Sequence, residues 1–232
     1  MTGDAAPLVL YSGPLSMFGA KVQIAMLEKG LDFELVMVPF DMKLLYQPKH
    51  PAVLRINPKQ QVPVLVHGGL ELFDSTQIFE YLEELQARPA LWPAGLADKA
   101  RARLLEHSAD EVYFPPVIRL MGLQDQLQHA PAVAACEACA AYYRSMDALL
   151  EGRDWLAGSY SFADIAFYMA QLFGARMGVP MGESTPRLLA WRERMSARPA
   201  VRQVAGAMGH YLLSQHRVLP EFLAALVKQD SR

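Results

Sequence analysis

The order of the apolar segments constrains the fold of this chain more than any other feature of its sequence. Residues 7–11 (PLVLY) form a short apolar run bounded by Ser-Gly-Pro, which is typical of a buried strand. The stretch from Ser16 to Gly30 has helical spacing, and its apolar face carries Val22, Ala25 and Met26. Residues 33–38 then alternate as a strand does. The chain therefore opens with a predicted β-α-β unit.

A hairpin and a helix follow an irregular, proline-containing stretch over residues 39–61. In VPVLVHGGLELF two apolar runs are separated by Gly68-Gly69, which predicts a hairpin because glycine tolerates positive φ. DSTQIFEYLEEL is predicted to be a helix capped by Asp74 or Ser75, with four inward-facing apolar residues: Ile78, Phe79, Leu82 and Leu85. The order β-α-β and then β-β-α predicts a thioredoxin-like domain over residues 1–86.

The rest of the chain carries helical patterns. Residues 87–97 begin with the Pro- and Gly-rich ARPALWPAG and are predicted to be a linker. From residue 98 to 232 no strand signal returns, and prolines and glycines divide the sequence into five or six expected helices. The fold class is therefore α/β followed by all-α: a thioredoxin-like domain and a C-terminal helix bundle.

Composition excludes several classes of protein. Of the 232 residues 52% are apolar and 20% are charged, the net charge is −2, and no basic cluster of the kind that binds nucleic acid occurs. No apolar stretch reaches the length of about 18 residues that a membrane span requires. The first residues lack the pattern of a signal peptide. We therefore expect a cytoplasmic protein that binds neither nucleic acid nor membranes.

Cys136 and Cys139 have the spacing of a redox pair or of half a zinc site. Their surroundings, AACEACAAYY, are typical of a helix interior, and no second pair of ligands lies nearby, whereas zinc takes four. We expect two small helical residues and no metal.

Residues 161–164 (SFAD) have the form of a capping box with Asp in place of the usual Glu, and Tyr160 and Ile165 can form its hydrophobic staple. Asp164 is therefore expected to be buried and to accept backbone N–H hydrogen bonds. This role is structural.

Four local patterns, taken in order, resemble the cytosolic glutathione transferase family over nearly the whole chain. They are YSGPLSMFGAKVQIAMLEKG, INPKQQVPVLV, LFDSTQIFEYLEE and SYSFADIAF. The resemblance implies glutathione as co-substrate, a second substrate that is an apolar electrophile, a role in detoxification, and a homodimer. It is of the serine type found in bacterial members, because Ser16 stands where other members carry cysteine.

The resemblance also implies how glutathione is held. The Val62-Pro63 bond is cis in the family, and the backbone of Val62 then pairs with the cysteinyl part of glutathione. Asp74 and Ser75 lie at a predicted helix start, where free N–H groups and the helix dipole attract a carboxylate. Ser75 is thus expected to bind the γ-glutamyl carboxylate and Asp74 its ammonium, and the alternative role of these residues is a plain N-cap.

Ser16 is the catalytic candidate. A thiol with a pKa of about 8.5 is mostly protonated at pH 7, and a hydroxyl donor at a helix N-terminus stabilises its thiolate. Tyr11 is the rival donor, because other classes use a nearby tyrosine, and Ser16 has a helix cap as its alternative role. A serine cannot form the mixed disulfide that cysteine-type members form, so conjugation, isomerisation or dehalogenation is expected in place of thiol–disulfide exchange.

The remaining site residues follow from their positions in the family pattern. Lys49 and His50 lie where several classes contact the glycyl carboxylate, with a solvated loop as the alternative. The apolar lining of the second pocket is expected from Phe18, Tyr113, Phe114 and Val117, although Tyr113 and Phe114 are equally suited to an ordinary core.

A second hypothesis is a non-catalytic relative on the same fold. LYSGP and EYLEE also resemble stringent starvation protein A, which binds RNA polymerase. Relatives of that type tend to lack a donor at the position of Ser16, so Ser16 favours the enzyme.

Overall fold

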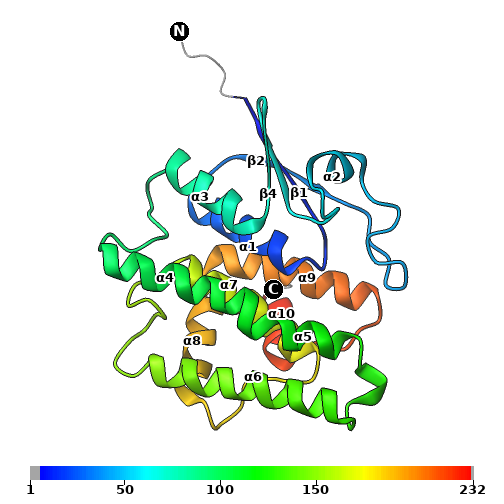
Figure 1. Cartoon of the computed structure of the whole chain (residues 1–232), viewed down its shortest axis with the longest axis vertical. Coiled ribbons are helices and arrows are strands. Elements are labelled where there is room, and N and C mark those ends of the chain that lie inside the picture. Colours follow the sequence, from blue (N-terminus) through cyan, green and yellow to red (C-terminus); the bar gives the residue numbers. More distant parts are fainter. Residues whose placement is uncertain (1–5, 231–232) are drawn as a thin grey trace. The chain divides into compact units, whose positions relative to one another are not determined.

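The computed structural model describes residues 6–230, which divide into two compact units. Unit 1 contains the described residues up to Ala90 together with Gln203–Val218, and unit 2 contains Leu91–Arg202 and the described residues from Leu219. Figure 1 labels most of the elements of both.

Unit 1 contains a four-stranded mixed sheet in the order β2-β1-β3-β4. Its strands are β1 (Leu8–Ser12), β2 (Phe33–Met37), β3 (Val64–His67) and β4 (Leu70–Phe73). β1 runs parallel to β2 and antiparallel to β3, and β3 and β4 form the expected hairpin, with Gly68 at φ +59° in its turn. The thioredoxin-like prediction is confirmed.

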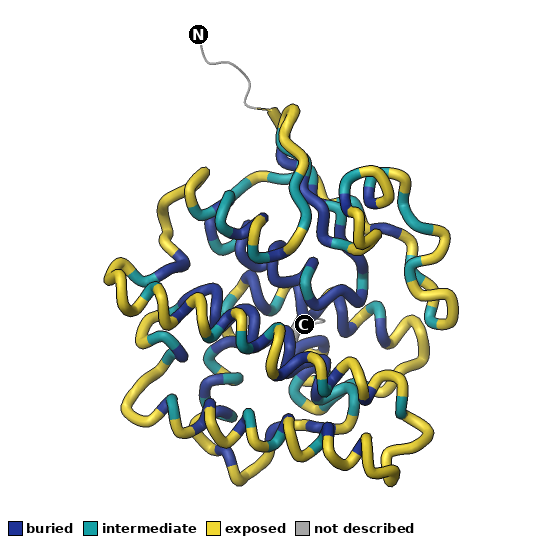
Figure 2. Tube along the Cα trace, in the orientation of Figure 1, coloured by how far each residue is buried: buried dark blue, intermediate teal, exposed yellow. Residues whose placement is uncertain are grey.

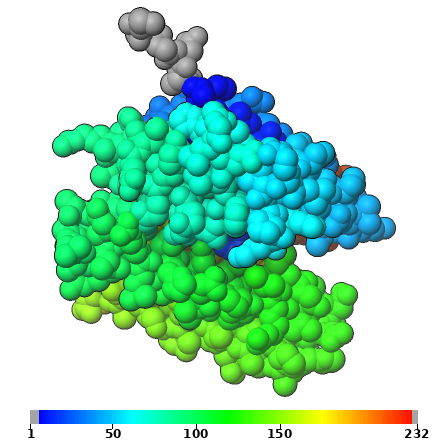
Figure 3. Space-filling model, turned by 45° about the horizontal axis from the view of Figure 1, so that its top comes forward, coloured from blue at the N-terminus to red at the C-terminus, as the bar shows by residue number. Residues whose placement is uncertain are grey.

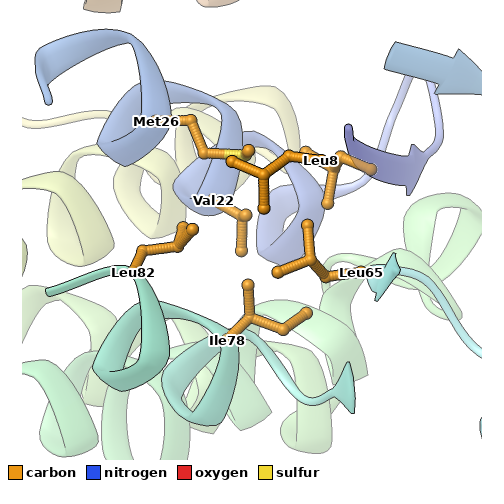
Figure 4. Close-up of a cluster of buried hydrophobic side chains, with 7 residues drawn as sticks. Leu8, Val22, Met26, Leu65, Ile78 and Leu82 are labelled. Atoms are coloured by element: carbon orange, nitrogen blue, oxygen red, sulfur yellow. The ribbon is translucent and has the colours of Figure 1, made fainter. Parts of the chain in front are cut away.

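Two helices cover one face of this sheet. Side chains of α1 (Met17–Glu28) and α3 (Ser75–Leu85) pack with alternate residues of β1 and β3 around Leu65, as Figure 4 shows. Leu85 is an exception to the expected inward face of α3, since it is 41% exposed at the last turn, where the helix extends past the sheet-facing cluster.

The opposite face carries a second cluster. Val38, Val64 and Val53 form it, together with part-buried aromatic residues that include Tyr11. Val53 belongs to α2 (Pro51–Ile56), a short helix within the stretch that the sequence predicted to be irregular. His50 caps it and Pro51 occupies its first turn, where a missing N–H costs nothing, so a proline that looked like a breaker is a helix start.

All the regular secondary structure in the described residues of unit 2 is helical. Its elements are α4 (Leu96–Ser108), a π-helical turn (Ala109–Tyr113), α5 (Phe114–Met121), a 3-10 turn (Gln124–Gln126), α6 (Ala130–Leu149), α7 (Phe162–Arg176), α8 (Pro186–Ser196), the start of α9 (Pro199–Ser214) and α10 (Glu221–Asp230). α7 is buried over residues 162–174, whereas buried and exposed positions alternate along α6 (Figure 2).

The described helices from α4 onward are seven, against five or six expected. The difference arises at Pro199 and Pro220, which the sequence reading did not treat as helix boundaries. Pro199 is the first residue of α9, and Pro220 directly precedes α10. At Pro199 proline is favoured for the same reason as at Pro51 in α2.

The unit boundary also differs from the expected domains. Leu91 and Trp92, within the predicted linker, are buried, and the Leu91 carbonyl accepts the Phe162 N–H at 2.9 Å, so this part of the segment packs in unit 2. In the other direction, Gln203–Val218 groups with unit 1, where the Tyr211 hydroxyl donates to the Phe40 carbonyl at 3.1 Å.

Candidate functional site

Ser16 caps the first helix of unit 1. Its backbone is extended (φ −100°, ψ 112°), and its Oγ accepts the Gly19 N–H at 3.0 Å. The side chain is largely buried. In the described chain this is the one hydrogen bond of the Ser16 hydroxyl, so its proton is not donated to any of these residues. The helix-cap role of Ser16 is confirmed, and no described residue uses its donor capacity.

Ser12, four residues earlier, is a polar residue that the sequence reading did not identify. It is wholly buried, and its Oγ accepts a hydrogen bond from Gln23 Nε2 at 2.8 Å. The signal was present in the strand, because Leu8 and Leu10 point inward and the next inward position is a serine.

Tyr11 lies on the other face of β1. It packs in the cluster of Val38, Val53 and Val64, and its ring centroid is 5.1 Å from that of His50. His50 in turn uses Nδ1 to accept the Ala52 N–H at 3.2 Å as the cap of α2. Tyr11 therefore has a packing role.

The Val62-Pro63 bond is cis, as the family resemblance implied. The turn that precedes it is held by Asn57, whose Nδ2 donates to the Gln61 carbonyl at 2.6 Å and whose Oδ1 accepts the Lys59 N–H at 2.9 Å. Val62 itself forms no main-chain hydrogen bond with the described residues. Its N–H and C=O are open to an extended peptide-like ligand.

The start of α3 distinguishes the two candidate cap residues. Asp74 is the N-cap, because its Oδ1 accepts the N–H groups of Thr76 at 3.1 Å and Gln77 at 3.3 Å. Its φ of +75° is rare for a residue other than glycine, and such strain is found at ligand sites. Ser75 is the first helical residue, is 4% exposed, and forms no hydrogen bond through its N–H or hydroxyl with the described chain. A pair of open donors therefore stands at the positive end of a helix dipole.

The segment from Phe40 to His50 lies at the surface of unit 1, light blue in Figure 3. Lys49 is half-buried there and has no acidic partner among the residues described. Phe18 is half-buried on α1, with the Lys21 amine 5.5 Å from the centre of its ring.

The three predicted pocket residues of unit 2 are all buried: Tyr113 is 1%, Phe114 6% and Val117 0% exposed. The Tyr113 hydroxyl is hydrogen-bonded to that of Tyr143 at 2.5 Å, and burial raises the pKa of Tyr113 well above its ordinary value. A packing role is thereby established for each of them, and a role in binding the electrophile stays a prediction.

The structural assignments in unit 2 are confirmed. Asp164 is wholly buried and accepts the N–H groups of Leu156 and Ser161, each at 3.0 Å. Cys136 and Cys139 lie inside α6 with free thiols, and burial raises the pKa of Cys139 to about 12. None of the helices in the described chain combines the length and the apolar character of a membrane span.

Unit 1 contains a cavity of about 380 Å³ beside the turn that leads to Ser16. Most of its walls are apolar, and Gly13 and Gln23 belong to its lining. Phe40, Met208 and Tyr211 line it as well. Larger cavities lie in unit 2, but the residues that line them include no predicted site residue.

Comparison with known proteins gives the family. Models of the glutathione S-transferase N-terminal and C-terminal domains match residues 10–90 and 112–199. Glutathione S-transferase 3 of Zea mays is 32% identical over 215 residues, which are 88% of this chain and 95% of the maize protein. The chain belongs to the glutathione S-transferase family. It is an enzyme of that class, with glutathione as the co-substrate of the family.

Two further similarities bear on the site. The crystal structure of a glutathione S-transferase from Rhodospirillum rubrum matches with a TM-score of 0.72 and 29% identity, over 85% of this chain and 91% of that one. A stringent starvation protein A homolog of Coxiella burnetii is 32% identical over 109 residues, which are 46% of this chain and 48% of that protein. The second resemblance is therefore real but partial.

Proposed function

We propose that this transferase binds glutathione in unit 1, stabilises its thiolate through the Ser16 hydroxyl, and transfers the sulfur to an apolar electrophile. The observation that carries the proposal is that the Ser16 hydroxyl accepts a hydrogen bond but donates none within the described residues. Its oxygen accepts the Gly19 N–H at 3.0 Å, while its proton has no acceptor within the described residues. Because the Gly19 N–H holds the oxygen in place, the hydroxyl proton is available to be donated to an anion.

The γ-glutamyl end has a matching receptor at α3. The open N–H and hydroxyl of Ser75 suit the α-carboxylate, and the helix dipole adds to that attraction. Asp74 uses Oδ1 for capping, which leaves Oδ2 for the ammonium group. The cap and the ligand contact thus use different atoms.

The rest of glutathione is assigned to two further positions. The open main-chain N–H and C=O of Val62 suit the cysteinyl residue. Lys49, half-buried and without an ion pair in the described chain, suits the glycyl carboxylate. His50 is a weaker candidate, because the α2 cap already uses its Nδ1.

The chemistry then needs no side-chain nucleophile. The thiol of bound glutathione loses its proton to solvent, and the Ser16 hydroxyl donates to the resulting thiolate. The thiolate attacks an electrophilic carbon and displaces a halide, opens an epoxide or adds to an enone. Each unit by which the thiol pKa is lowered corresponds to about 1.4 kcal/mol of stabilisation of the thiolate.

The electrophile is proposed to be mostly apolar. Phe18, Tyr113, Phe114 and Val117 remain the proposed lining from the family pattern. The largely apolar cavity beside the turn that leads to Ser16 supports a small substrate of this polarity. A panel of halides, epoxides and enones distinguishes the reaction classes.

Ser16→Ala tests the donor. We expect glutathione to bind with nearly unchanged affinity at acid pH, the pKa of the bound thiol to return toward about 8.5, and conjugation near pH 7 to fall and partly recover as the pH rises. The measurement is thiolate absorbance of bound glutathione against pH, in wild type and variant. Identical titration curves would rule out Ser16 and favour Tyr11 or the backbone N–H groups of the helix start.

The partial resemblance to stringent starvation protein A supports the second hypothesis, a regulatory protein that binds RNA polymerase. Retention on immobilised glutathione with elution by free glutathione separates the two, because only the transferase needs that site. We also propose that the enzyme is a homodimer, that it is cytoplasmic, and that it acts in detoxification. Sedimentation of the purified chain tests the dimer.

A further inference from the structure

The glycine in the first turns of α1 has an unusual neighbour. Gly19 lies in a helix, where glycine costs about 1 kcal/mol relative to alanine. A Cβ at this position would lie 2.1 Å from Ser12 Oγ and 3.1 Å from Ser16 Oγ. The Ser12 hydroxyl therefore occupies the space that any other residue at 19 would need, and both serine hydroxyls lie against Gly19.

Ser12 is itself fixed on two sides. Its carbonyl accepts the Val38 N–H at 2.8 Å, and its Oγ accepts Gln23 Nε2 at the same distance. Gln23 is 5% exposed on the next turns of α1, so the pair links the end of β1 to the helix. The Ser12 hydroxyl is 0% exposed, so water does not compete with Gln23 for it, and the contact holds the end of β1 to α1.

The position of Ser16 depends on this contact. The Gly19 N–H is the group that holds Ser16 Oγ, at 3.0 Å, and the Ser12 hydroxyl fills the space where a side chain of residue 19 would lie. If Ser12 lost its hydroxyl, the first turn of α1 could shift toward the vacated space, and the Ser16 hydroxyl would move with the Gly19 N–H.

We propose that Ser12 and Gln23 are positioning residues for Ser16, which fix the Gly19 N–H and thereby the direction in which Ser16 donates to the thiolate. This inference rests on the proposed function of Ser16. It assigns Ser12 no contact with glutathione, because its side chain is wholly buried.

The test measures the pKa of bound glutathione in Ser12→Ala and Gln23→Met. We expect each to raise it by about half a unit to one unit, which is less than Ser16→Ala does, while the dissociation constant for glutathione at pH 6 changes less than twofold. Ser161→Ala is the matched control, since Ser161 is an equally buried serine in unit 2. It is expected to lower the unfolding midpoint without moving the thiol titration.

The double variant Ser12→Ala/Ser16→Ala separates positioning from direct action. Without the Ser16 hydroxyl, loss of the Ser12 hydroxyl should shift the thiol pKa no further. A further shift equal to that of Ser12→Ala alone would mean that Ser12 acts without Ser16, and would overturn the inference.

The outcomes also separate this inference from the proposed function. If Ser16→Ala raises the thiol pKa but Ser12→Ala and Gln23→Met leave it unchanged, only the positioning role is wrong. If Ser16→Ala itself has no effect, the proposed donor and the positioning role both fail. Should Ser12→Ala not fold, Gln23→Met gives the same decision, because it removes the amide and keeps a side chain of similar length.

Discussion

Replacement of Asp164 by alanine should destabilise unit 2 through donors that lose their acceptor. Asp164 Oδ1 accepts the Leu156 N–H at 3.0 Å and the indole N–H of Trp191 at 2.9 Å. Oδ2 accepts the N–H of Ser161 at 3.0 Å and its hydroxyl at 3.2 Å. The carboxyl group is 0% exposed, so water does not replace it at these donors.

The loss of folding free energy caused by Asp164→Ala is the difference between two effects. The buried N–H groups of Leu156 and Trp191 cost about 1–3 kcal/mol each when they lose their acceptor. The lost cap at Ser161 costs about 1 kcal/mol more. Against this, burial raises the pKa of Asp164 from 3.8 to about 6, so the ionised acid carries a penalty of roughly 3 kcal/mol relative to its protonated form. The expected net loss at pH 7 is on the order of 2 kcal/mol.

The same shift fixes the pH dependence. Folded Asp164 binds its proton at a higher pH than unfolded Asp164, so its contribution to stability is fully present below pH 4 and is lost as the pH rises through 6. The loss caused by Asp164→Ala should therefore be about 1 kcal/mol larger at pH 5 than at pH 8.

Denaturant unfolding of wild type, Asp164→Ala, Trp191→Phe and the double variant measures the effect. In the Trp191→Phe background the indole donor is absent, so Asp164→Ala should cost less by about 1–2 kcal/mol. Asp98→Ala is the control, since Asp98 is an exposed acid in the first turn of α4. Additive free energies, or a loss that shrinks as the pH falls, would refute the reasoning.

Three further predictions concern separate contacts. Ser75→Ala should raise the KM for glutathione roughly tenfold or more with a smaller change in kcat, because a hydrogen bond to a carboxylate remote from sulfur is made equally in ground and transition states; an unchanged KM would exclude the contact. Lys29→Met should cost about 3–5 kcal/mol in denaturant unfolding, because it leaves Glu83 without the buried amine at 2.5 Å, whereas Arg55→Ala at an exposed pair should cost less than about 1 kcal/mol. In the folded protein Cys139 should resist thiol reagents far longer than the half-buried Cys136, because burial raises its pKa to about 12, and equal labelling rates would contradict this.

The spacing of apolar residues was sufficient to predict the elements that bury one face in a common core. The sheet, α1, α3 and the hairpin follow from apolar spacing because each buries one face in the cluster around Leu65. It failed where a proline begins a helix, as at Pro51 and Pro199. A proline removes the same N–H whether it ends a helix or starts one, and only the packing of the following turn distinguishes the two.

The candidate site residues that lie at the start of a helix could be predicted from the sequence. Ser16, Asp74 and Ser75 lie at helix starts that sequence signals identify. Ser12 and Gln23 were missed because their contact spans a strand and a helix, and no local pattern specifies which buried polar residues meet. For Tyr113 the sequence left a pocket role and a core role open, and the structure packs it against the tyrosines of α6.

The two helix starts of unit 1 show why a cap and a ligand contact are not alternatives. An N-cap uses one acceptor lone pair, and an anion needs a donor. At α3 two residues divide the tasks, because the Asp74 carboxylate accepts and the Ser75 hydroxyl and N–H remain open. At α1 one hydroxyl does both, since Ser16 Oγ accepts the Gly19 N–H and keeps its proton. Replacement by a residue that caps without a proton to give, as in Ser16→Asp, should therefore preserve the helix while removing thiolate stabilisation.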